Sequence, residues 1–290
     1  MEALRAIGGE PPPSEELWYW IGLAGFVVGM LVIVGLWVRG RGEDQDHFVL
    51  AFAAAALAAI SYFAMGAGLL DFQVADSHVA QVPHYVDWLV TTPLLLLSLV
   101  IVGLPPVQHF ARQRERTTLV TGLLGLNTGM LLCVLFAQLT ETRSHQRVWY
   151  AIAAACFLAV AWLLLVSSRQ RAQAHGGRNV GIYHAMALFL VVSWALYGVA
   201  WALGPQGAGD LWGETTDAAV LTVLDLASNL VFSLLLLLGL ERLRHQVPER
   251  TGHGTIELAS GFDEVDDALE AERSGRFQRE PQAGQAPLLP

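Results

Sequence analysis

The sequence contains no lysine. All 17 residues in its lysine and arginine total are arginines, so any chemistry that needs a lysine side-chain amine is excluded. Charged residues are also scarce, at 15% of 290 residues, against about 25% in soluble domains. Only two cysteines occur, Cys133 and Cys156, both in apolar segments, and neither has a metal or redox pattern. We expect no metal site and no nucleic-acid partner.

Apolar residues make up 54% of the chain and gather in seven long segments. Each segment has about 20 residues or more and can cross a hydrocarbon core of about 30 Å as a helix. We therefore predict an all-α membrane protein, a seven-transmembrane-helix bundle that is multi-pass in the cell membrane and has the lipid bilayer as its first partner. We place the segments near 17–38, 47–70, 82–104, 117–139, 147–168, 181–203 and 215–240.

The chain divides into one bundle and two polar ends. Residues 1–16 are predicted to be a flexible N-terminus, 17–242 the seven-helix domain, and 243–290 a flexible cytoplasmic tail that lacks a sustained apolar pattern.

Arginines divide unequally between the two sides of the predicted bundle. Eleven fall in the loops after the first, third and fifth segments and at the start of the tail, against three on the other side. This asymmetry predicts an N-terminus outside and a C-terminus in the cytoplasm. The eleven are Arg39, Arg41, Arg112, Arg114, Arg116, Arg169, Arg171, Arg178, Arg242, Arg244 and Arg250; the three are Arg5, Arg143 and Arg147.

The third segment carries most of the polar groups inside the predicted membrane. Asp87 and Thr91 are four residues apart and share a helix face, and His84 lies one turn outward from Asp87. Ser98 follows eleven residues later, about 16 Å along the same face. Ionisable groups at such depth are costly and are candidates for function.

The sixth and seventh segments add aromatic and acidic groups. Asp225 lies in the apolar run of the seventh segment, and Asp217 is near its outer end. Trp194, Tyr197 and Trp201 have the spacing of one helix face. Such a stripe alone is typical of core packing, but together with two carboxylates at similar depth it favours a small-ligand site between helices.

Four motifs resemble those of one protein family. They are "YVDWLVTTPLLLL" (85–97), "WALYGVAW" (194–201), "VLDLASN" (223–229) and "SYFAM" (61–65). They resemble the third-, sixth-, seventh- and second-helix motifs of microbial (type I) rhodopsins of the bacteriorhodopsin-like kind. The resemblance covers residues 17–242.

That resemblance implies a seven-helix bundle with retinal bound as a Schiff base on a seventh-helix lysine. By position, it implies that Asp87 is the counterion and proton acceptor, Thr91 its hydrogen-bond partner and Asp225 the second counterion. Asp217 falls near a proton-release position. The implied pocket walls are Tyr62, Met65, Trp88, Thr92, Trp194, Tyr197 and Trp201.

The departures from the family pattern decide the interpretation. Asn229 stands at the Schiff-base lysine position, and an amide nitrogen is not a nucleophilic amine. His84 replaces the family's arginine, Ser98 stands at the internal proton-donor position, and Gly198 replaces a usual proline. With both permanent cations absent, two carboxylates remain. We expect Asp87 and Asp225 to titrate as a coupled pair with at least one neutral at pH 7. We also expect His84 to supply a pH-dependent counter-charge.

Three functions stay open at this point. The first is a membrane protein, not an enzyme, that has no covalent cofactor and is not a working light-driven pump. It binds retinal or another apolar small molecule non-covalently, or acts as a sensory or partner subunit. The second is a light-driven proton pump or photoreceptor, as the family motifs imply. The third is a ligand-independent membrane scaffold. A homo-oligomer is compatible with each, since family members form trimers or pentamers.

Overall fold

The computed structural model describes residues 13–39, 45–69, 71–74, 78–103, 110–140, 142–167, 180–205 and 211–245. The chain has two units, Met1–Glu241 and Arg242–Pro290, and the site described below belongs to the first. The first helix begins at Pro13, so the last four residues assigned to the N-terminal segment are helical. The rest of that segment and residues 246–290 of the predicted tail lie outside the described residues.

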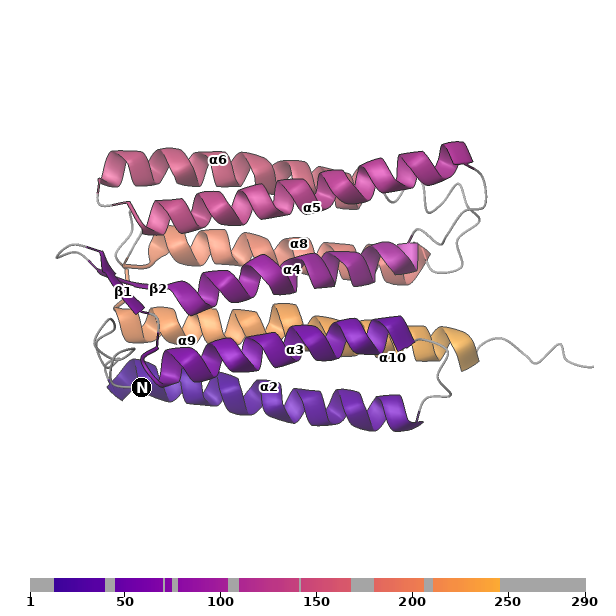
Figure 1. Cartoon of the computed structure of the whole chain (residues 1–290), viewed down its shortest axis with the longest axis horizontal. Coiled ribbons are helices and arrows are strands. Elements are labelled where there is room, and N and C mark those ends of the chain that lie inside the picture. Colours follow the sequence, from indigo (N-terminus) through magenta and orange to yellow (C-terminus); the bar gives the residue numbers. More distant parts are fainter. Residues whose placement is uncertain are drawn as a thin grey trace, which may run out of the picture. The chain divides into compact units, whose positions relative to one another are not determined.

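The described part of the chain contains seven helices long and apolar enough to cross a membrane. They confirm the predicted fold class (Figure 1). Two of them change from α-helix to π-helix along their length, at η1 and η2. The elements of the spans are α2 (Pro13–Arg39), α3 (Gln45–Gly66), α4 (Val82–Gly103), α5 (Phe110–Gln138), α6 (Arg143–Trp162) with η1 (Leu163–Ser167), α8 (Val180–Leu203), and α9 (Glu214–Asp225) with η2 (Leu226–Val231) and α10 (Phe232–His245).

The helices close into a ring. Each of α2 to α6 contacts the next, α8 contacts η1, and α9 packs against both α8 and α2. The η2 segment also contacts α3 and α4, so the seventh span lies where four other helices can reach it. This arrangement places residues near 225 at the centre of the bundle.

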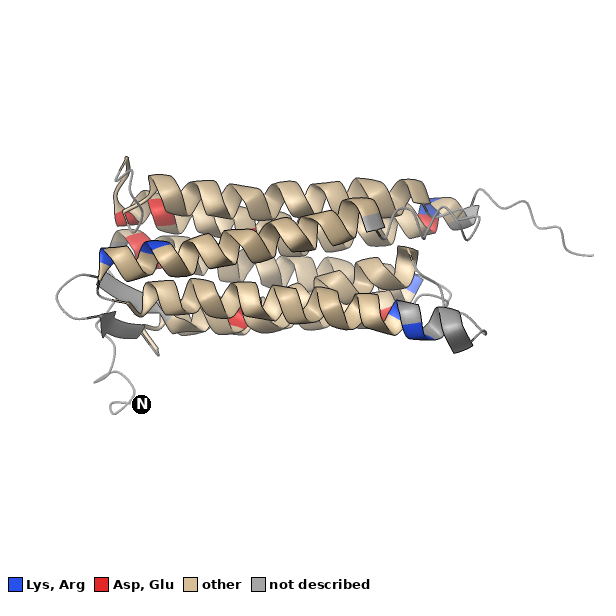
Figure 2. Cartoon of the chain, turned by 90° about the horizontal axis from the view of Figure 1, so that it is seen from above, with Lys and Arg blue, Asp and Glu red and all other residues tan. Residues whose placement is uncertain are grey.

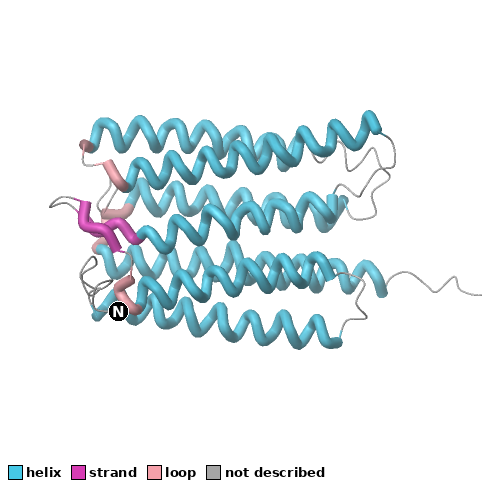
Figure 3. Tube along the Cα trace, in the orientation of Figure 1, coloured by secondary structure: helices cyan, strands magenta, loops and turns pink. Residues whose placement is uncertain are grey.

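A short hairpin is an addition to the predicted all-helical fold. Strands β1 (Asp71–Val74) and β2 (His78–Gln81) pair antiparallel, with Asp71 opposite Gln81 and Val74 opposite His78. The hairpin precedes α4 at one end of the bundle (Figure 3). Because each strand has only four residues, the pattern is too short to stand out in the sequence.

The outer surface of the bundle is apolar. Leu31, Val38, Leu158 and Trp162 are each more than 60% exposed, whereas charged side chains gather mainly at the two ends of the helices (Figure 2). A soluble monomer rarely exposes such continuous apolar area. A lipid-facing surface accounts for it, since the helices have the length and composition to span a bilayer.

Small residues bring α2 and α3 together beside the site. Ala51, Ala55 and Ala58 of α3 are buried in one cluster with Phe26 of α2, and small side chains allow helices to approach closely in a membrane. At Gly22 an added Cβ would overlap the Tyr62 ring. The missing side chain therefore lets the Tyr62 ring pack against α2 while its hydroxyl points to Asp225.

Candidate functional site

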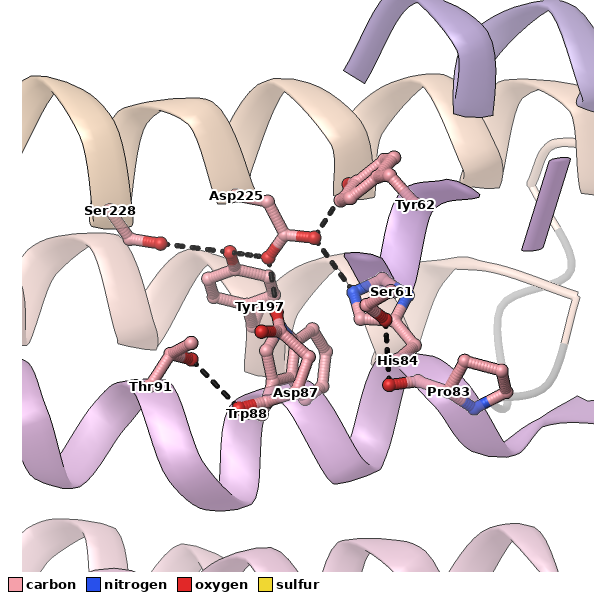
Figure 4. A network of polar contacts seen from close by, with 10 residues as sticks. All are labelled: Ser61, Tyr62, Pro83, His84, Asp87, Trp88, Thr91, Tyr197, Asp225 and Ser228. Atoms are coloured by element: carbon pink, nitrogen blue, oxygen red, sulfur yellow. Dashed lines mark hydrogen bonds and ion pairs between the residues drawn. The ribbon is translucent and has the colours of Figure 1, made fainter. Parts of the chain in front are cut away.

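Asp225 is the centre of a buried polar network (Figure 4). It is the last residue of α9 and has no exposed surface. Its Oδ1 accepts hydrogen bonds from the indole Nε1 of Trp88 at 2.9 Å and the hydroxyl of Tyr197 at 2.5 Å. Its Oδ2 accepts one from the hydroxyl of Tyr62 at 2.6 Å. Helices α4, α8 and α3 thus each direct one donor to the same carboxylate, which satisfies the acceptors that burial removes from water.

His84 lies against the same carboxylate. Its Nε2 is 2.8 Å from Asp225 Oδ2, an ion-pair distance without the alignment of a hydrogen bond. The imidazole packs edge-on against the Trp88 indole, with ring centroids 4.3 Å apart. The hydroxyl of Ser61 donates to the carbonyl of Pro83 at 2.7 Å and fixes the start of α4 on α3. His84 therefore stands where a counter-charge for Asp225 can form.

Asp87 has a different environment. Its side chain is 5% exposed, and among the described residues neither carboxyl oxygen has a hydrogen-bond partner. The Thr91 hydroxyl donates to the main-chain carbonyl of Asp87 at 2.9 Å, not to the carboxyl group that the family pattern suggests. The reason is local, because a threonine hydroxyl in a helix reaches the carbonyl four residues before it. A bare ionised carboxylate at such a position costs several kcal/mol.

This contrast predicts which of the two aspartates is neutral. At pH 7 we expect the infrared spectrum of the purified protein to contain a protonated-carboxyl stretch that disappears in Asp87→Asn and persists in Asp225→Asn, because only Asp87 lacks donors. A spectrum in which both side chains show only carboxylate bands would contradict the assignment.

A cavity of about 550 Å³ lies inside the bundle. Its size falls within the range of small-ligand sites. Trp201 stacks on Tyr150 with centroids 3.5 Å apart, and Trp88 meets Tyr197 edge to face at 5.0 Å. The aromatic side chains of the wall are Tyr19, Tyr85, Trp88, Tyr150, Phe157, Trp194, Tyr197 and Trp201.

The structure brings some of the predicted site residues to this cavity and leaves others outside. Tyr62 and Met65 do not line it, because their side chains are buried in the cluster between α2 and α3. Asp87 and Asp225 do not line it either, and Ser98 is buried on α4. The predicted residues that line the cavity are His84, Trp88, Thr92, Trp194, Tyr197, Trp201, Asp217 and Asn229.

Asn229 is exposed to the cavity but not to solvent. It lies in η2, is 3% exposed, and its Oδ1 has no hydrogen-bond partner among the described residues. The π-helical turn around it is a feature often found at functional sites. Covalent retinal does not fit these residues, since an amide stands at the attachment position and the chain holds no lysine. The aromatic side chains give the cavity a largely apolar wall.

Two features of the site escaped the sequence analysis. Asn127 of α5 is fully buried, and its Nδ2 donates at 2.7 Å to the Thr92 hydroxyl, which in turn donates to the carbonyl of Trp88 at 2.8 Å. The isolated asparagine in the apolar run "LLGLNTGMLL" is the signal that could have found it. Glu15 lines the cavity but fell within the segment predicted to be flexible.

Comparison with known proteins identifies the family. The family model described as "Bacteriorhodopsin-like protein" matches residues 13–243. A bacteriorhodopsin of Haloterrigena sp. (strain arg-4) is 30% identical over 230 residues, which are 77% of this chain and 87% of that protein. Cruxrhodopsin-1 of Haloarcula argentinensis is 30% identical over 239 residues, 78% of this chain and 90% of its own.

Solved structures agree with the sequence comparison. The crystal structure of thermophilic rhodopsin from Rubrobacter xylanophilus has a TM-score of 0.72 and 29% identity, covering 79% of this chain and 97% of that one. A light-driven proton pump rhodopsin from Coccomyxa subellipsoidea has a TM-score of 0.69 and 25% identity, covering 78% and 97%. The chain is therefore a multi-pass cell-membrane protein that belongs to the bacteriorhodopsin-like family of microbial rhodopsins.

Proposed function

We propose that this protein does not form a covalent retinal pigment and uses its cavity to hold retinal or another apolar small molecule non-covalently. The observation that carries this proposal is Asn229 on the cavity wall of a chain without lysine. A buried amide at that position leaves the cavity without an amine nucleophile. A role as a receptor or sensory subunit follows more directly from this site than a role as a pump or an enzyme.

The polar network argues against light-driven proton transfer. In a pump of this family, the resemblance implies that the third-helix aspartate takes a proton from the retinal linkage. Here no such linkage forms, and the carboxyl group of Asp87 has no hydrogen-bond partner among the described residues. The donors of the network converge on Asp225 instead, which suits a structural role for that carboxylate.

The cavity favours a ligand over the scaffold alternative. Protein interiors are packed nearly as densely as organic crystals and keep few voids larger than a water molecule. A bundle that served only as a scaffold has no need to keep about 550 Å³ open between aromatic walls. The aromatic stripe of α8 therefore supports a binding role, with Trp194, Tyr197 and Trp201 all on the cavity wall.

Titration with all-trans retinal tests the proposal. In the purified full-length protein, retinal is expected to quench tryptophan fluorescence saturably, because Trp88, Trp194 and Trp201 line the cavity. The absorption should stay near that of the free aldehyde, and hydroxylamine should convert all of the retinal. Trp162→Phe is the control, because that side chain is 64% exposed and does not line the cavity; this variant should retain the binding. A red-shifted pigment that resists hydroxylamine would overturn the proposal.

A further inference from the structure

We infer that the cavity selects a ligand that carries a protonated amine head group on an apolar tail. This inference rests on the proposed function, since it needs the cavity to take a ligand. It goes further by assigning the charge and the hydrogen-bonding character of that ligand.

The cavity wall contains acidic residues but no permanently charged basic residue among the described residues. Glu15 of α2 and Glu214 and Asp217 of α9 line the cavity. No arginine is among the lining residues in the part of the chain that the structure describes, and lysine is absent from the sequence. A concave site lined by one sign of charge raises the local concentration of the opposite charge. The wall therefore attracts cations and repels carboxylates.

The acidic residues lie at one end of the bundle. Glu15 is in the first turn of α2, and Glu214 and Asp217 are in the first turn of α9. The hydroxyl of Thr215 donates to the hydroxyl of Ser14 at 2.9 Å, so these two helix starts are adjacent. The three carboxylates therefore lie toward the same end of the cavity.

An acceptor without a hydrogen-bond partner lies farther along the cavity, on η2. Asn229 lies twelve residues after Asp217, which is about 18 Å along the helix. Asn229 is only 3% exposed, and yet its Oδ1 has no donor among the described residues. Buried oxygens of this kind are nearly always hydrogen-bonded. A ligand N–H on the cavity side supplies the missing donor.

The neighbouring side chains favour a charged donor over a neutral one. Hydrogen bonds from an ammonium group are stronger than those from a neutral donor. The rings of Trp88 and Tyr197 share this wall with Asn229, and aromatic rings attract cations. Met130, Leu131 and Phe157 of α5 and α6 form an apolar wall for the tail. The head group therefore points to η2, and the tail lies against α5 and α6.

Three probes with one tail and different head groups test this inference. They are all-trans-retinylamine, all-trans-retinol and all-trans-retinoic acid, titrated into the full-length protein in an uncharged detergent with tryptophan fluorescence as the readout. Because the tail is common to the three, differences in Kd report the head group. We expect the amine to bind about tenfold more tightly than the alcohol, and the acid to bind most weakly.

Variants locate the origin of the preference. Asn229→Leu removes the orphan oxygen and keeps the number and branching of the side-chain heavy atoms, and we expect the amine-to-alcohol ratio to fall to about threefold or less. Glu214→Gln combined with Asp217→Asn should weaken the amine and strengthen the acid. Asp46→Asn removes one exposed carboxylate from the first turn of α3, at the opposite end of the bundle, and should leave all three affinities unchanged.

The outcomes separate this inference from the function on which it rests. Saturable retinol binding without a preference for the amine, or a preference that survives both sets of variants, overturns the inference and leaves the proposed function standing. Failure of all three probes to bind overturns both. An amine preference that is lost in Asn229→Leu and reduced in the acidic double variant supports both.

Discussion

Asn229→Lys, with all-trans retinal added, is expected to turn a colourless protein into a coloured and covalently linked pigment. The substitution places a primary amine on a cavity wall that already has its aromatic residues in place. Asp225 lies one turn before it on the same span, with its carboxylate held by donors from α3, α4 and α8. A negative group close to a developing positive charge stabilises that charge. We therefore expect a change from no visible pigment to nearly complete conversion.

The measurement is the visible spectrum before and after hydroxylamine, followed by borohydride reduction and mass spectrometry. Because the parent chain has no lysine, the introduced residue is the only lysine to which retinal can attach. Val223→Lys is the matched control, since that side chain is on the same span and 57% exposed on the outer surface, where no cavity surrounds it. An Asn229→Lys variant that folds but stays colourless would show that the cavity does not admit retinal.

Asp225→Asn is expected to lower the free energy of unfolding by about 3 kcal/mol. The fully buried carboxylate accepts three hydrogen bonds and contacts His84. An amide of the same size replaces one acceptor oxygen by a donor, so hydrogen-bond donors in the network face another donor. Stability measured by denaturation in detergent reports the loss.

Asp87→Asn is the matched control for that prediction. The chemical change is the same, and the site is also buried, but neither oxygen of Asp87 has a partner to lose within the described residues. We expect an effect within about 1 kcal/mol, because the substitution removes no hydrogen bond of the Asp87 carboxyl group. Equal losses from the two variants would show that burial, not the hydrogen-bond network, sets the contribution of these carboxylates.

The sequence predicts the bundle well because the bilayer imposes a simple requirement. A helix that crosses it needs about 20 apolar residues, and the seven apolar segments are long enough to be recognised one by one. The predicted ends of the helices are less accurate. The second span ends at Gly66 where the apolar run suggested 70, because the run continues through "AGLL" beyond the end of the helix.

The contacts between the site residues were harder to predict than which residues belong to the site. The family motifs indicate that Asp225 and Tyr62 belong to the site, but 163 residues separate them, and the packing of α3 against the seventh span brings Tyr62 to Asp225. The same holds for Thr91, whose hydroxyl donates to the main-chain carbonyl of Asp87 and not to the Asp87 carboxyl group. Long-range hydrogen bonds depend on helix rotation, which the periodicity of one segment does not specify.

The π-helical segment η2 has a consequence for how the seventh span tolerates change in length. A π turn accommodates one residue more than an α turn, and one residue corresponds to about 100° around an α-helix. Deleting one residue within 226–231 would therefore restore regular winding and keep the two halves of the span in phase. Asp225 would stay beside its donors, and Phe232 and Leu236 would stay buried. The same deletion in the α-helical part of the span would turn the rest of the helix by about 100°, so the span can lose a residue within η2 more readily than elsewhere.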